Sequence, residues 1–108
     1  MILTDKCKQD FEKWFINKYG FDKENQLMYS LKEFYNLDFS MQYGVFVDFF
    51  DSVGIWLVVE EQFGDGKYYD WCINTKNNEW YHQTDFKTRG KAREKSLEKA
   101  NEIHNNRQ

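Results

Sequence analysis

Apolar residues near the start of the chain recur at the spacing of a helix with one buried face. Between residues 5 and 19 these positions are Cys7, Phe11, Trp14, Phe15 and Tyr19. The steps 7–11, 11–14, 11–15 and 15–19 are three or four residues long, which is the period of one helix face. Thr4 is suited to cap the start of such a helix. Gly20 stands where a left-handed residue commonly follows a helix end. The pattern predicts a helix over residues 5–19.

A second apolar stripe predicts a further helix over residues 23–35. Its positions are Leu27, Leu31, Phe34 and Tyr35. Their spacing of i, i+4, i+7 and i+8 is helical, and Asp22 is available as a cap at the start. The two stripes together predict two helices in the N-terminal third of the chain.

The chain then becomes rich in β-branched and aromatic residues. Residues 43–50 and 55–61 both have this composition, and residues 51–54 between them are Asp-Ser-Val-Gly. Two such runs around a short polar segment are typical of a β-hairpin. Because apolar residues occupy both faces of these runs, we expect either strands that are covered on both sides or strands with one face covered by a partner.

Two more strands are predicted after a glycine-rich turn. Residues 64–67 read Gly-Asp-Gly-Lys, and the alternating segment 68–73 follows them. A polar loop over residues 74–79 then leads to a short strand over residues 80–84. Strands joined by such short connections form antiparallel neighbours.

The final helix is expected over residues 89–105. Ala92, Ser96, Ala100 and Ile103 share one face, while lysines and glutamates alternate on the other. The predicted fold is therefore α+β, with two N-terminal helices, a four-stranded antiparallel meander and a C-terminal helix packed on the sheet. We expect one domain over residues 1–108, with an ordered core from about residue 3 to 105.

Composition narrows the class of protein. Of 108 residues, 19% are aromatic, none is proline, and the formal net charge is −3. No apolar run has the roughly 18 residues that a membrane helix needs. The first residues lack the apolar core of a signal peptide. With only two cysteines, a disulfide framework is not expected. We therefore expect a cytoplasmic protein with reduced thiols and no membrane partner.

Charge is distributed unevenly along the chain. Residues 36–71 hold seven acids and one lysine, whereas residues 87–108 hold seven bases and three acids. Either the acidic sheet complements the basic helix internally, or it forms an acidic, aromatic surface for a protein partner. An edge strand would also permit self-association into a homo-oligomer. The candidate partner-binding residues are Trp56, Glu60, Tyr69, Trp71 and Trp80.

The start of the last helix suggests a nucleic-acid module as the alternative. Its candidate phosphate-binding residues are Lys87, Arg89, Lys91 and Arg93. For the two arginines, an internal ion pair with Asp48, Asp70 or Asp85 is the competing interpretation.

The basic segment Arg89-Gly90-Lys91-Ala92-Arg93 is similar to the Lys-Lys-x-Ala-Lys pattern of double-stranded-RNA-binding domains, which have an α-β-β-β-α order. An extra helix, a fourth strand and an acidic sheet depart from that family. Since binding to duplex RNA depends on phosphate contacts, the acidic sheet disfavours this interpretation.

A second resemblance covers most of the chain from Tyr43 onward. The segment Tyr43–Ile55, the later Thr88-Arg89-x-x-Ala92-Arg93 and the segment Lys99–Ile103 resemble small proteins encoded in phages and prophages. The resemblance implies no activity. It implies a context in which small accessory proteins and inhibitors of host systems are common.

An enzyme is the third possibility. Cys72 and His82 lie on neighbouring predicted strands and could form a nucleophilic pair. The two histidines and two cysteines include no close pair of metal ligands, and there is no glycine-rich phosphate loop. Asp48 with Asp51, or Glu60 with Glu61, could hold a divalent cation, but adjacent residues of a strand point to opposite faces. We therefore expect a non-enzymatic protein, with no catalytic residue, no metal and no cofactor.

Overall fold

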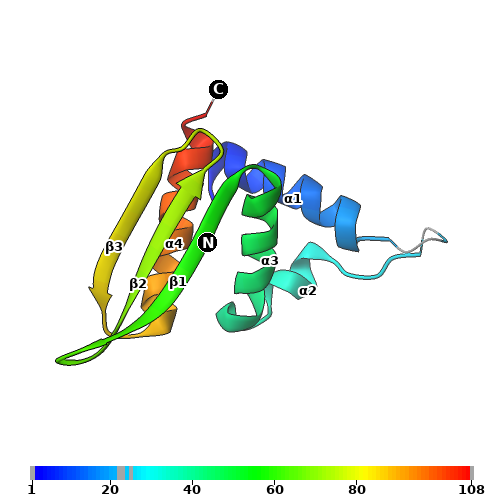
Figure 1. Ribbon diagram of the computed structural model, residues 1–108. Helices are drawn as coiled ribbons and strands as arrows, with labels where there is room; N and C mark the ends of the chain where they lie inside the picture. Colours follow the sequence, from blue (N-terminus) through cyan, green and yellow to red (C-terminus); the bar gives the residue numbers. More distant parts are fainter. Residues whose placement is uncertain (1, 22–23, 25, 108) are drawn as a thin grey trace.

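A computed structural model describes residues 2–21, 24 and 26–107 of the chain. It is an α+β fold in which a three-stranded antiparallel sheet has its helices on one side (Figure 1). In chain order the elements are α1 Asp5–Tyr19, α2 Leu31–Tyr35, α3 Phe39–Ser52, β1 Ile55–Gly64, β2 Gly66–Thr75, β3 Trp80–Phe86 and α4 Arg89–Asn105.

The first and last helices have the predicted bounds, and the turn at residues 64–67 joins two antiparallel strands as expected. The order β1-β2-β3 is a simple meander. The prediction of four strands is wrong, because three strands form the sheet within the described residues.

Residues 43–50 were expected to form a strand, but they belong to α3. Phe46, Phe49 and Phe50 are buried at i, i+3 and i+4, the spacing of one helix face. Aromatic and β-branched residues favour strands only weakly, and burial against surrounding elements overrides that preference. The expected hairpin between residues 43–50 and 55–61 is therefore absent, and β1 begins directly after α3.

The predicted helix over residues 23–35 is much shorter than expected. Within the described part of that segment, α2 spans only Leu31–Tyr35, and Leu27 instead forms an isolated antiparallel bridge with Phe21. Ser30 starts the helix: its hydroxyl accepts the Glu33 backbone N–H at 3.1 Å and donates to the Glu33 carboxylate at 3.2 Å. The Ser-x-x-Glu pattern of this helix start is visible in the sequence. The expected cap, Asp22, lies outside the described residues.

Two glycines are needed for different reasons. Gly54, between α3 and β1, has φ +75°, and a Cβ there would lie 2.7 Å from the Lys76 side chain. Gly20 is not left-handed as predicted, because its φ is −70°. A Cβ at Gly20 would instead lie 2.6 Å from the Ile16 carbonyl oxygen. The short turn at each helix end therefore depends on the missing side chain.

The core lies between the inner face of the sheet and the helices. Helix α4 packs on β1 and β2, α3 packs on β1, and α1 packs on α4 and α3. The ring of Phe11 is fully buried among five other rings at centroid distances of 5.0 to 6.0 Å. The sheet contributes Ile55, Leu57, Trp71 and Ile73 to this core. Only one face of the sheet is covered in this way.

None of the described helices is both long and apolar enough to cross a lipid bilayer.

Candidate functional site

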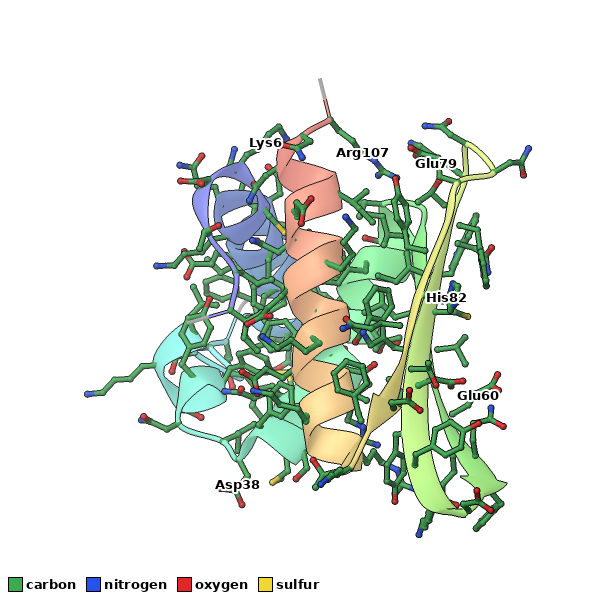
Figure 2. All side chains as sticks on the ribbon, turned by 90° about the vertical axis from the view of Figure 1, so that its left-hand side faces the viewer. Lys6, Asp38, Glu60, Glu79, His82 and Arg107 are labelled. Atoms are coloured by element: carbon green, nitrogen blue, oxygen red, sulfur yellow. The ribbon has the colours of Figure 1, made fainter. Side chains whose placement is uncertain are left out.

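None of the helices that the structure describes lies on the second face of the sheet (Figure 1). Ten side chains with cross-strand partners alternate onto this face, and together we call them the open face. They are Trp56, Val58, Glu60, Gln62, Tyr68, Asp70, Cys72, Asn74, Trp80 and His82. Figure 2 shows the labelled Glu60 and His82 on the side of the sheet turned away from α4.

Two tryptophans and a valine dominate one end of the open face. The exposed fractions of Trp56, Val58 and Trp80 are 43%, 43% and 56%. Trp56 and Trp80 lie on either side of Asn74, which pairs with both of them across the sheet. The Trp80 ring stacks on the His82 ring with centroids 4.3 Å apart. Large apolar side chains so exposed on a regular sheet are typical of a contact surface.

The other end of the open face is acidic. Glu60 on β1 lies directly opposite Asp70 on β2. Four residues along an extended strand span about 13 Å, so these carboxylates lie about that far from the row of Trp56. The open face includes no lysine or arginine. It is therefore apolar at one end and negative at the other.

The next residue on β1, Glu61, points to the opposite side of the sheet and is neutralised there. Its carboxylate lies 2.9 Å from the Lys67 amine and 3.0 Å from the Arg89 guanidinium. The Lys67 hydrogen bond is the largest cause that lowers the pKa of Glu61. The acidity available to a partner thus comes from Glu60 and Asp70.

Five residues were expected at the partner surface, and strand alternation separates them. Trp56, Glu60 and Trp80 lie on the open face and are exposed. Tyr69 and Trp71 point to the inner face and are buried, with exposed fractions of 9% and 5%. In this structure Tyr69 and Trp71 are core residues that a partner does not reach.

Sequence reasoning left out other members of the open face, above all Val58, Asp70 and Asn74. The alternation of side chains along each strand, counted from Trp56 and from Trp80, indicated which residues of the same strand share their face. The sequence did not give the register between strands, and a shift of one residue moves a side chain to the other face. Only the pairing of Trp56 with Asn74, and of Asn74 with Trp80, places these residues together.

Cys72 and His82 do face each other, as the sequence suggested, because they are paired across β2 and β3. Burial, and then the charge of Glu60, raise the pKa of the Cys72 thiol. A nucleophilic cysteine needs the opposite shift, towards the thiolate. The His82 ring is stacked on Trp80. The pair therefore has the setting of an ordinary half-buried thiol beside an aromatic stack.

The basic start of α4 is engaged within the protein. Arg89 was expected to pair with Asp48, Asp70 or Asp85, but its partner is Glu61. Lys91 lies 3.7 Å from the Glu94 carboxylate. The Arg93 guanidinium lies over the Tyr43 ring, 4.9 Å from its centroid. Of the candidate phosphate-binding residues, Arg89, Lys91 and Arg93 therefore have internal contacts, and Lys87 is exposed.

No metal site is present among the described residues, where no three His, Cys, Asp or Glu side chains are clustered suitably. Comparison with models of protein families, with curated proteins and with solved structures found no match. The functional argument therefore depends on the chemistry of the surfaces.

Proposed function

We propose that this protein is a non-enzymatic accessory protein that binds another protein through the open face of its sheet. The observation that carries this proposal is the exposure of Trp56 and Trp80 on a sheet face that no helix covers. Tryptophan is among the residues most enriched at the energetic centres of protein interfaces. The resemblance to small phage and prophage proteins supports an accessory role, such as inhibition of a host system.

The charge on the open face defines the partner's chemistry. A complementary segment is apolar where it meets Trp56 and Trp80, and carries lysine or arginine about 13 Å further on, opposite Glu60 and Asp70. A second copy of this chain is a poor match, because it would bring its own Glu60 and Asp70. A phosphate backbone is a poor match for the same reason of like charge.

Nucleic acid remains the second candidate because of one observation. The order α3-β1-β2-β3-α4 is the α-β-β-β-α order that the resemblance to double-stranded-RNA-binding domains implies. The fourth strand that argued against that family does not form among the described residues. Against it stands the internal pairing of Arg89 and Lys91 with Glu61 and Glu94.

The test is a comparison of captured proteins from the native host. The bait is the wild-type chain or the double variant Trp56→Ser plus Trp80→Ser. Phe63→Ser is the matched control, because Phe63 is 75% exposed but lies outside the open face. We expect a protein that the wild type and the control retain and the double variant loses. With the purified partner, each single tryptophan variant should weaken binding roughly 30-fold.

A charge variant tests the partner's chemistry. Glu60→Lys should weaken binding and reduce its salt dependence, since the new lysine offsets the charge of Asp70 and faces a basic segment of the partner. The proposal is wrong if the double tryptophan variant captures the same proteins as the wild type. It is also wrong if the chain binds duplex RNA tightly, with steep salt dependence, and Lys87→Glu plus Lys91→Glu abolishes that binding.

A further inference from the structure

An apolar groove lies on the opposite side of the molecule from the sheet. It has a volume of about 390 Å³ and is formed by the end of α1, by α2 and by α3. Among the residues whose structure is described, Glu33 is the one charged residue of its lining. The apolar lining consists of Phe15, Tyr19, Tyr29, Phe34, Leu37 and Val45.

Exposed apolar residues surround this groove. Leu37 at the end of α2 is 41% exposed, and Met41 in the first turn of α3 is 61% exposed. Met41 lies one helical turn before Val45, so the two share a face of α3. The groove and its rim therefore form a continuous apolar surface.

An apolar projection stands beside the groove. We call it the arm, and it consists of Phe21 and residues 26–28. Phe21 and Leu27 are bridged, and their exposed fractions are 52% and 69%. The backbone N–H of Tyr29 donates to the Tyr19 carbonyl at 3.3 Å, which holds the base of the arm to the end of α1. In Figure 1 this segment projects away from the helices, on the side opposite β3.

We propose that a second copy of this chain docks on this surface, with the arm of each copy lying in the groove of the other. A surface that contains both an apolar projection and an apolar groove is self-complementary under a two-fold axis. Each arm then covers its partner's Leu37 and Met41. This interface is separate from the open face and leaves that face available to its own partner.

The size of the molecular surface supports a pair of this kind. A compact monomer of this mass exposes about 6,400 Å², whereas this chain exposes 7140 Å². The excess of roughly 700 Å² means that the chain leaves more surface uncovered than a compact monomer does, and the exposed Leu27, Leu37 and Met41 contribute to it. The radius of gyration of 15.1 Å likewise exceeds the ~13 Å of a compact domain of this length.

Charge favours a second copy here, although it opposes one on the open face. Residues 16–37, which carry the arm and much of the groove, contain three lysines and three acids. Two copies of this neutral segment can meet without net repulsion. Apolar surface with no dominant charge is also the composition of homodimer interfaces.

The test is sedimentation equilibrium of the full chain up to roughly 500 µM, a range that detects even weak dimers. The wild type should rise from 13.2 kDa toward twice that mass with concentration. Leu27→Glu in the arm and Met41→Glu at the groove each put a charge into the apolar contact. Each should raise the dimer dissociation constant roughly 10- to 100-fold. Both side chains are exposed, and circular dichroism checks that the variants fold.

Trp56→Glu on the open face is the matched control, since it adds the same charge at another exposed apolar position. We expect this variant to dimerise like the wild type. The proposal is overturned if the wild type stays monomeric over the whole range. It is also overturned if Leu27→Glu and Met41→Glu dimerise as well as the wild type, or if Trp56→Glu alone abolishes the dimer. The last outcome would place the dimer on the open face.

Discussion

The start of α1 is held by a residue from the other end of the chain, and this makes a sharp prediction about stability. Thr4 occupies the capping position, but its side chain makes no capping bond to α1. The cap comes from α4. The Asn105 side-chain oxygen accepts the Cys7 backbone N–H at 2.7 Å, and its side-chain nitrogen donates to the Thr4 carbonyl at 3.1 Å.

Replacing Asn105 by alanine removes these two bonds and a longer one, in which the side-chain nitrogen donates to the Thr4 hydroxyl at 3.3 Å. Loss of a helix cap costs about 1 kcal/mol. The bond to the Thr4 carbonyl is exposed, and that carbonyl also accepts the Lys8 N–H at 3.1 Å, so its loss costs only about 0.5 kcal/mol more. We therefore expect Asn105→Ala to reduce the free energy of unfolding by about 1.5 kcal/mol. For a domain of this size that loss lowers the melting temperature by roughly 8 °C.

The measurement is urea unfolding followed by circular dichroism, with a thermal melt as a second reading. Asn106→Ala is the matched control. Asn106 is the next residue, its side chain is exposed, and it contributes to the end of α4 only through its backbone N–H. The control should change stability by less than about 0.5 kcal/mol. If Asn105→Ala is no more destabilising than the control, the two ends of the chain are not coupled by this side chain and the reasoning is wrong.

Two further predictions concern ionisable groups. Hydrogen bonds from Lys6 and then His104 hold the pKa of Asp10 below its ordinary value of 3.8. Asp10 therefore adds stability above pH 3.8 that is lost as the pH falls through its lowered pKa, and melts of the wild type and Asp10→Asn should converge there. If their difference is the same at pH 7 and pH 3, this linkage is refuted. Burial raises the pKa of Cys7 to about 12, and Cys7 has no exposed surface. A thiol reagent at pH 8 should therefore label the half-buried Cys72 first and reach Cys7 only on unfolding. Equal labelling rates for the two thiols in the native state would contradict the buried position of Cys7.

The helices at the two ends of the chain were predictable because their local pattern and their packing agree. In α4, Ala92, Ala100 and Ile103 are buried on the predicted face. In α1, Phe11 and Phe15 are buried as their spacing indicates. Thr88 also caps α4 through a side-chain bond to the Lys91 N–H at 3.1 Å. Where pattern, caps and burial all favour the same element, the sequence alone is sufficient.

Helix α3 was not predictable from composition, because its residue types favour a strand while its spacing also permits a helix. Phe46 and Phe50 lie on one helix face, and in a strand they would also share one face. The period therefore did not decide between the two. The helix is favoured by packing against the aromatic cluster around Phe11. The centroid of the Phe11 ring lies 5.0 Å from that of Phe46 and 5.4 Å from that of Phe49.

The sequence by itself determined the class of the fold, the hairpin at residues 64–67, both terminal helices and the surplus of aromatic residues on the strands. Only the tertiary structure decided which of those aromatics are core. Trp71 is buried, while Trp56 and Trp80 are exposed. The physical reason is that helices cover one face of the sheet, and the register between strands sets which side chains point to that face. Coverage and register both arise from contacts between residues distant in sequence.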